Sequence, residues 1–211
     1  MESPLDRFLN TRDALHVAGD GQMQFAGSGR CPTARVILPG SFNPIHQGHW
    51  KLAQVAQQIL GAPAAFEMSV VNVDKPAMTA AEIRRRLRPF NWQASVWLTH
   101  APLFVEKAAC FPGATFVVGA DTALRIVSPR YYRDDADAMS AALTAIGGRG
   151  CRFLVACRVD ARGECMALRD LPIPEAFARL FDEIPASEFR WDASSTELRM
   201  RGEATSPLPG N

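Results

Sequence analysis

From Ala34 onward, short apolar runs alternate along the chain with longer stretches in which apolar residues recur at helical spacing. The runs are rich in Val, Leu and Phe and end near turn residues, which is typical of strands buried on both faces of a sheet. They are ARVILPG at 34–40, AFEMSVVNV at 65–73, ASVWLT at 94–99, TFVVGAD at 115–121 and RFLVACRV at 152–159. Each run is predicted to be a strand.

Helical patterns fill the intervals between these strands. A helix is predicted over residues 47–60, which carry apolar side chains on one face and are followed by Gly61 as a stop signal. A second helix is predicted over 79–87, because Thr79 and Glu82 form a capping box at its start. Further helices are predicted near 102–110, 121–127 and 135–146. Strands that alternate with helices predict an α/β fold, a doubly wound parallel sheet with helices on both faces. Ligands of such sheets bind outside the carboxyl ends of the strands, where the strand order reverses.

The two ends of the chain depart from this alternation. Ser3 can cap a helix that has Pro4 at its first position and runs to about Val17, and glycines then punctuate a flexible connector. The predicted divisions are an N-terminal extension over 1–33, one α/β domain over 34–202 and a loose tail over 203–211.

Composition and charge narrow the class of protein. The 211 residues carry a formal net charge of +1, so the electrostatic field of the whole protein does not favour binding to nucleic acid or to an anionic membrane. Any recognition of phosphate must therefore come from a local group of residues. The sequence shows neither a signal-peptide pattern nor an apolar run of membrane-spanning length, which favours a cytoplasmic protein. The cysteines are odd in number and form no C-x-x-C pair, so free and mostly buried thiols are expected. They are Cys31, Cys110, Cys151, Cys157 and Cys165.

The first candidate site follows the first predicted strand directly, in GSFNPIHQGH at 40–49. Gly40 lets the backbone approach a ligand closely, and the free N–H groups at the start of the next helix favour an anion. His46 and His49 bracket a glycine there, so both rings can reach one bound phosphate. Alone, the segment also fits a turn with one capping and one packed histidine.

Imidazole N–H groups suit the attack of an acceptor phosphate on the α-phosphorus of a nucleoside triphosphate. Negative charge then builds on the non-bridging and leaving oxygens, and fixed donors stabilise that charge without forming a covalent intermediate. One such donor contributes about 3 kcal/mol in other enzymes.

The second candidate site is DASSTELR at 192–199, which opens a predicted terminal helix. Ser194, Ser195 and Thr196 would present hydroxyl groups beside free backbone N–H groups, and Arg199 follows one turn later with a permanent charge. The segment by itself also fits an ordinary capping box followed by a solvated arginine, so both interpretations stay open.

The middle of the chain adds weaker signals. Asp121 follows Gly119 at the end of a strand, where its carboxylate can cap the next helix or accept ribose hydroxyls. Lys75 follows the second strand, and a loop lysine is ordinarily solvated. The arginine run at 84–86 is predicted to be a solvated face, and Trp97 is expected in the core. Aromatic residues available for stacking a base are Trp92, Trp97, Phe104, Tyr131 and Tyr132.

Taken together, the two motifs resemble those of the nucleotidylyltransferase superfamily. GSFNPIHQGH is similar to its G-x-F-x-P-x-H-x-G-H signature, and SSTELR at 194–199 to its I-S-S-T-x-x-R signature, with Ala193 in place of the isoleucine. Within the superfamily, the chain most resembles nicotinamide and nicotinate mononucleotide adenylyltransferases, which have a Rossmann-like fold and use ATP with Mg²⁺.

The resemblance implies roles for named residues. It makes His46, His49 and Arg199 the catalytic contacts to the triphosphate. No dedicated set of protein ligands for a metal ion is visible in the sequence. The resemblance assigns nucleotide binding to Gly40, Ser41, Phe42, Asn43, Lys75, Gly119, Asp121, Ser194, Ser195 and Thr196.

The implied reaction transfers AMP from ATP to nicotinate or nicotinamide mononucleotide and releases pyrophosphate, with Mg²⁺ carried by the triphosphate. The same residues also fit CTP as the donor or another phosphorylated metabolite as the acceptor. A third alternative is a nucleotide-binding regulator or a hydrolase on the same fold. In each case the partners expected are small molecules, without nucleic acid or membrane, and a homo-oligomer is compatible with the sequence.

Overall fold

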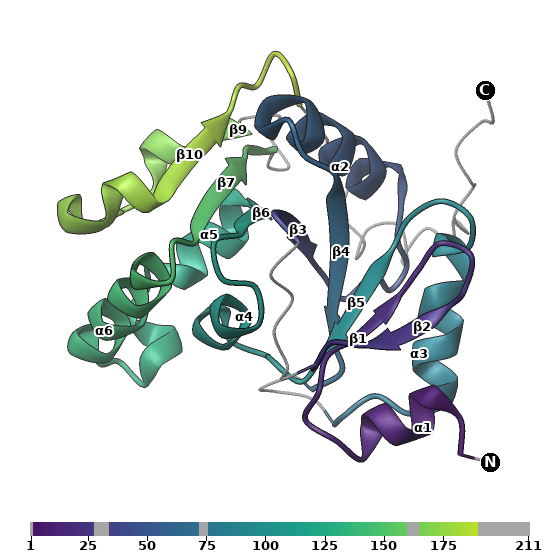
Figure 1. Ribbon diagram of the computed structural model, residues 1–211. Helices are drawn as coiled ribbons and strands as arrows, with labels where there is room; N and C mark the ends of the chain where they lie inside the picture. Colours follow the sequence, from purple (N-terminus) through teal and green to yellow (C-terminus); the bar gives the residue numbers. More distant parts are fainter. Residues whose placement is uncertain (1, 28–33, 72–75, 160–164, 190–211) are drawn as a thin grey trace.

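The computed structural model describes residues 2–27, 34–71, 76–159 and 165–189 (Figure 1). One sheet has eight strands in the order β10-β7-β6-β3-β4-β5-β1-β2, and β8 and β9 form a separate two-stranded ladder. The strands are β1 Leu15–Val17, β2 Met23–Phe25, β3 Val36–Pro39, β4 Ala64–Ser69, β5 Val96–Thr99, β6 Thr115–Gly119, β7 Arg152–Ala156, β8 Arg158–Val159, β9 Cys165–Met166 and β10 Phe181–Ile184. The α-helices are α1 Pro4–Leu9, α2 Gln47–Leu60, α3 Ala80–Leu87, α4 Phe104–Cys110, α5 Ala120–Ile126 and α6 Ala136–Gly148.

The sheet is mostly parallel. Its strands from β5 through β4, β3, β6 and β7 to β10 all pair in parallel, whereas β1 pairs antiparallel with both β5 and β2 at one edge. The chain moves outward from β3 in one direction through β4 and β5, then returns to the other side of β3 through β6 and β7. This is the doubly wound order with its switch point between β3 and β6. The predicted α/β, Rossmann-like fold is therefore confirmed.

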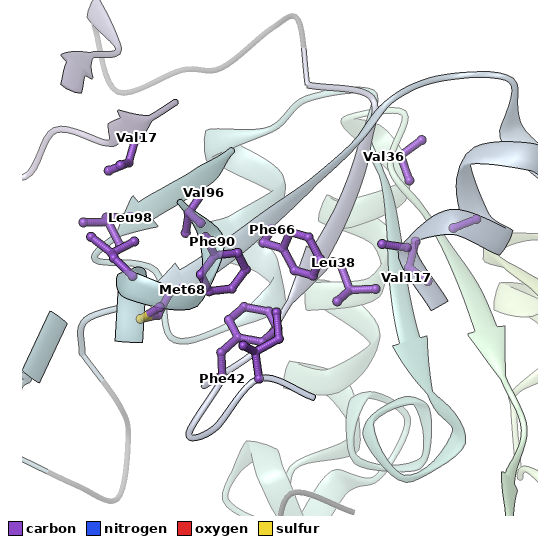
Figure 2. Close-up of a cluster of buried hydrophobic side chains, with 14 of the residues drawn as sticks. Val17, Val36, Leu38, Phe42, Phe66, Met68, Phe90, Val96, Leu98 and Val117 are labelled. Carbon is purple, nitrogen blue, oxygen red and sulfur yellow. The ribbon is translucent and has the colours of Figure 1, made fainter. Parts of the chain in front are cut away.

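Two hydrophobic clusters cover the two faces of the sheet. Successive side chains of a strand point to opposite faces, so Val36 and Leu38 enter the first cluster and Ile37 the second. Residues of α1, α2 and α3 complete the first cluster, part of which Figure 2 shows, and residues of α4, α5 and α6 complete the second. Trp97, which was expected in the core, is partly buried at the margin of the second cluster, where it packs against the rings of His16 and Phe111.

Local sequence signals placed the helices well. Helix α2 spans the predicted residues and ends at Gly61, whose φ of 62° lies in the left-handed region that glycine adopts readily. The hydroxyl of Thr79 accepts a hydrogen bond from the backbone N–H of Glu82 at 3.3 Å, so the predicted N-terminal cap of α3 is present. The helices α4, α5 and α6 lie within two residues of the predicted bounds at every end.

The N-terminal prediction was correct only at its start. Ser3 caps α1 by accepting from the backbone N–H of Asp6 at 3.2 Å, but the helix ends at Leu9 and does not continue to Val17. Residues 15–17 form β1, and the expected flexible connector folds back as β2, so both strands belong to the sheet. Pairing with β5, which is distant in sequence, decides this outcome.

The strand predictions also needed correction. The run at 152–159 divides into β7 and β8, the run at 65–73 ends as a strand at Ser69, and the run at 115–121 ends at Gly119. Strand β10 was not predicted, because its sequence FDEI has apolar residues only at its two ends. It forms because it pairs in parallel with β7.

A buried ion pair fastens α4 to the sheet. The ammonium group of Lys107 lies 2.8 and 2.7 Å from the two carboxylate oxygens of Glu67, and the hydroxyl of Thr99 donates to the same carboxylate at 2.6 Å. Glu67 is fully buried and Lys107 nearly so. Because both carboxylate oxygens have partners, the charges can be buried without an unpaired group.

Candidate active site

A cleft of about 230 Å³ opens where the strand order reverses, at the carboxyl ends of β3 and β6. Segments from β3, α2, β6, α5 and the β7–β8 junction line it. The described lining residues are Leu38, Pro39, His46, Gly48, His49, Leu52, Val117, Val118, Gly119, Asp121, Thr122, Ala156, Cys157, Arg158 and Phe189. The cleft thus brings together four residues that the sequence singled out, His46, His49, Gly119 and Asp121.

The two histidines are held in contact at the start of α2. His46 is the N-cap of the helix and His49 lies in its first turn. The backbone N–H of His46 donates to Nδ1 of His49 at 3.2 Å, and the two ring centroids are 3.8 Å apart. Because Nδ1 of His49 accepts this hydrogen bond, the neutral ring carries its proton on Nε2. His49 therefore has one ring N–H with which to contact a ligand.

Burial lowers the pKa of both histidines. Desolvation brings the pKa of His46 from 6.5 to about 4, and desolvation followed by repulsion from His46 brings the pKa of His49 to about 3. Both rings are consequently uncharged at neutral pH. They can donate N–H groups to developing negative charge, but a positive charge must come from another residue.

Phe42 shapes the loop that leads to these histidines. It is buried, has a φ of 43° in the left-handed region, and packs edge-on against His49 at a centroid distance of 5.2 Å. A Cβ atom added to Gly40 would lie 2.6 Å from two ring atoms of Phe42. The missing side chain at Gly40 therefore makes room for this ring. Gly40 and Phe42 are not among the described residues that line the cleft. Their assignment to the nucleotide site therefore stays a prediction.

Helix α3 holds the same loop from the other side. Arg86 donates to the carbonyl oxygen of Ser41 at 2.7 Å, and Arg85 donates to the side-chain oxygen of Asn43 at 2.6 Å. Glu82 accepts hydrogen bonds from both arginines at 2.8 Å. The expected solvated face is present at Arg84 and Arg85, which are exposed, but Arg85 and Arg86 also hold the motif loop in position. Within the described lining of the cleft, Ser41 and Asn43 do not appear, and their contact with nucleotide stays a prediction.

Asp121 has a different local role from the one expected. Gly119 is the N-cap of α5, so Asp121 lies inside the first turn and does not cap the helix. Its carboxylate instead forms an ion pair with Arg158, with 3.1 Å between Oδ2 and Nη1. Arg158 was not identified as a candidate site residue from the sequence. Its position just after β7, the neighbour of β6, was the available signal, because carboxyl ends of adjacent parallel strands meet at one edge.

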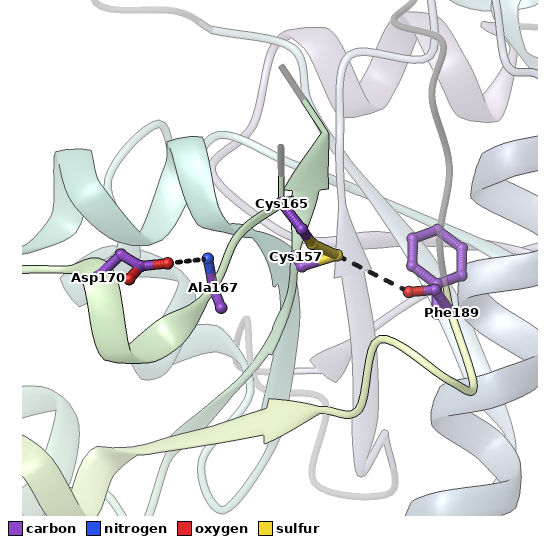
Figure 3. Close-up of a disulfide and its surroundings, with 5 residues drawn as sticks. All are labelled: Cys157, Cys165, Ala167, Asp170 and Phe189. Atoms are coloured by element: carbon purple, nitrogen blue, oxygen red, sulfur yellow. Dashed lines mark hydrogen bonds between the residues drawn. A yellow bond between two sulfur atoms is a disulfide. The ribbon is translucent and has the colours of Figure 1, made fainter. Parts of the chain in front are cut away.

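The expectation that every cysteine is a free thiol was wrong. Cys157 and Cys165 form a disulfide, shown in Figure 3, and Sγ of Cys157 lies 3.9 Å from the carbonyl oxygen of Phe189. The short β8–β9 ladder returns the chain toward Cys157, which the sequence did not reveal. Cys110 and Cys151 are free as expected, and burial raises the pKa of both thiols.

The aromatic residues proposed for base stacking lie elsewhere. Phe104 packs in the second hydrophobic cluster between two other phenyl rings, and Tyr132 donates its hydroxyl to a backbone carbonyl at 2.9 Å. Trp92 and Tyr131 are exposed on the surface. Among the described residues, the phenyl ring that lines the cleft belongs to Phe189, for which the sequence carried no signal of a binding role.

Several predicted site residues fall outside the described ranges, and their roles stay predictions. They are Lys75, Ser194, Ser195, Thr196 and Arg199. Within those ranges, no group of three or more His, Cys, Asp or Glu residues is arranged to hold a metal ion. No helix in the described part of the chain is long and apolar enough to cross a membrane.

The chain is similar in sequence to a known family and to a known protein. Residues 37–201 match the family model described as Cytidylyltransferase-like. A protein of Schizosaccharomyces pombe described as "Putative nicotinamide mononucleotide adenylyltransferase" is 30% identical over 113 residues. That match covers 47% of this chain and 45% of the relative, so it spans less than half of the relative's length.

Proposed function

Because the chain belongs to the cytidylyltransferase-like family of the nucleotidylyltransferase superfamily, we propose that it transfers AMP from ATP to nicotinate or nicotinamide mononucleotide. A phosphate oxygen of the acceptor attacks the α-phosphorus of ATP. The bond from this phosphorus to the bridging oxygen breaks, and pyrophosphate leaves with the electron pair. The products are a dinucleotide and pyrophosphate.

The observation that carries this proposal is the pair of uncharged histidines at the switch point of the sheet. His46 and His49 line the cleft, and the hydrogen bond to Nδ1 of His49 directs its proton to Nε2. Such fixed N–H donors stabilise the charge that builds on phosphate oxygens, and they need no rearrangement during the reaction. The choice of a pyridine mononucleotide as acceptor rests on the name of the relative from Schizosaccharomyces pombe.

The site fits a metal ion that arrives with the nucleotide. Mg²⁺ usually takes one or two carboxylates together with substrate phosphates and waters. Asp121 is the one carboxylate among the described lining residues and is paired with Arg158, so the ligands of the ion would come mainly from the triphosphate and water. When bound, Mg²⁺ would neutralise part of the triphosphate charge.

The test is pyrophosphate release with ATP or CTP, Mg²⁺ and a panel of acceptors. The panel contains both pyridine mononucleotides, flavin mononucleotide, phosphopantetheine and several sugar and alcohol phosphates. We expect release with ATP and a pyridine mononucleotide. Release with CTP, or only with another acceptor, would overturn the substrate assignment. Absence of release with every pair would refute transfer.

Variants separate the chemistry from general damage to the fold. His49→Ala removes the ring donor and should lower kcat by about 10²–10³-fold. His16→Ala is a matched control, because His16 lies on β1 and packs on Trp97 away from the cleft. Circular dichroism checks that both variants fold. Unchanged turnover in folded His49→Ala would refute the role of this histidine.

A further inference from the structure

The charges in the cleft are few and nearly balanced. At neutral pH His46 and His49 are uncharged, which leaves Asp121 and Arg158 as the charged side chains among the described lining residues. Their charges cancel. A nucleoside triphosphate brings several negative charges, and Arg158 is the sole permanent cation that the described lining offers to them. Without Arg158, that lining would carry the negative charge of Asp121 alone.

The head group of Arg158 is paired but accessible. Its Nη1 lies 3.1 Å from Oδ2 of Asp121, and the two side chains are 42% and 45% exposed. Exposed ion pairs of this kind add little to stability, so a more highly charged anion can displace the carboxylate. The planar guanidinium also matches two phosphate oxygens at once, which favours phosphate over a single carboxylate contact.

The backbone that carries Arg158 is fixed more firmly than its head group. Arg158 pairs with Met166 in the antiparallel β8–β9 ladder, and the preceding residue, Cys157, is cross-linked to Cys165. Cys157 itself lines the cleft. A long side chain on a held backbone can change partners over a short distance without moving the sheet.

We propose that Arg158 is a substrate-binding residue that takes the phosphate groups of the nucleotide, and that Asp121 is its intramolecular competitor. This inference rests on the proposed nucleotidyl transfer. Phosphate binding exchanges the partner of the guanidinium. The released Asp121 carboxylate is then able to accept hydrogen bonds from ribose hydroxyls, as expected for a carboxylate at the end of a strand in this fold.

Calorimetric binding of ATP and of inorganic tripolyphosphate to the full chain tests the exchange without any need for turnover. Arg158→Gln should weaken binding of both ligands about tenfold or more, because a hydrogen-bonded charge contact is lost. Arg158→Lys keeps the charge and should lose less. Arg152→Gln is the matched control, because Arg152 forms a somewhat more exposed ion pair with Asp182 away from the cleft. Its binding should stay within about twofold of the wild type.

Asp121→Asn gives the discriminating result. It removes the competitor of phosphate, so tripolyphosphate should bind as tightly as to the wild type or up to about fivefold more tightly. ATP should gain less than tripolyphosphate, because its ribose loses the carboxylate acceptor. Urea unfolding of each variant confirms that the compared proteins are folded.

Two outcomes would overturn the inference. Binding of tripolyphosphate to Arg158→Gln at wild-type strength would exclude a phosphate contact. Equal weakening of tripolyphosphate binding by Asp121→Asn and Arg158→Gln would show that the pair serves only to hold the fold. The proposed function fails separately: phosphate binding that depends on Arg158, without any dinucleotide product, would refute the reaction and leave the binding role standing.

Discussion

Lowering the pH is expected to destabilise the folded protein through His49. Burial lowers the pKa of His49 from 6.5 to about 3, and the backbone N–H of His46 donates to its Nδ1. In the unfolded chain the same ring titrates near 6.5. Between about pH 6.5 and pH 3 the unfolded state therefore binds a proton that the folded state does not. Stability is complete above this window and falls as the pH falls through it.

The magnitude follows from the two pKa values. At about pH 5, protonation stabilises an unfolded imidazole by RT ln(1 + 10^1.5), which is about 2 kcal/mol. The folded ring, with a pKa of about 3, gains almost nothing at that pH. We therefore expect His49 by itself to lower the free energy of unfolding by about 2 kcal/mol between about pH 8 and pH 5. This is a large share of the roughly 5–15 kcal/mol that stabilises a typical domain.

The variant His49→Gln isolates this contribution, because glutamine does not titrate. Urea unfolding of the wild type and the variant at about pH 8, 6.5 and 5 gives the difference in free energy of unfolding at each pH. That difference should shift by about 2 kcal/mol in favour of the variant as the pH falls to about 5. Ionisable groups common to both proteins largely cancel. A difference that does not change with pH would refute the neutral, buried state assigned to His49.

Three further predictions concern the scaffold around the site. Lys107→Met should lower the free energy of unfolding by about 3–5 kcal/mol in urea, because the buried carboxylate of Glu67 loses its cation. Gly40→Ala should lower the free energy of unfolding by about 1–3 kcal/mol and also lower kcat, because the new methyl group would lie 2.6 Å from the ring of Phe42. Cys165→Ser should lower the free energy of unfolding by about 2–3 kcal/mol, because the lost cross-link joins cysteines eight positions apart. Reduction of the wild type should lower it by the same amount.

Matched variants test whether these losses have the stated causes. Exposed Lys51→Met should change stability by less than about 0.5 kcal/mol, and the double variant Glu67→Gln, Lys107→Met should recover part of the loss. Gly148→Ala is the control for Gly40→Ala: a Cβ atom added at Gly148 has no neighbour within 4 Å, so this substitution should be tolerated. Cys110→Ser removes a free thiol and should leave the effect of reductant intact. Equal losses in a variant and its control would contradict the explanation given for that pair.

The sequence by itself determined the elements whose signals are local. Helix α2 begins at Gln47, directly after its N-cap His46, and is capped at its other end by Gly61, and the cap of α3 lies at Thr79. Hydrogen bonds within a few residues decide these points. The apolar runs also located β3 to β7, although several bounds moved. The alternation of strands and helices was enough to predict a parallel sheet and to place His46 just beyond the carboxyl end of its first strand, whereas the strand order that makes this position a switch point came from the structure.

Only the tertiary structure decided the features that depend on contacts between distant residues. Residues 15–17 become a strand because β5 supplies their hydrogen-bond partners, and β10 forms because β7 does so. Arg86 holds the loop at Ser41 across 45 positions of the chain. Arg158 meets Asp121 because two adjacent parallel strands end at the same edge of the sheet. Periodicity and capping signals act over a few residues, so they carry no information on which distant side chains share a cleft.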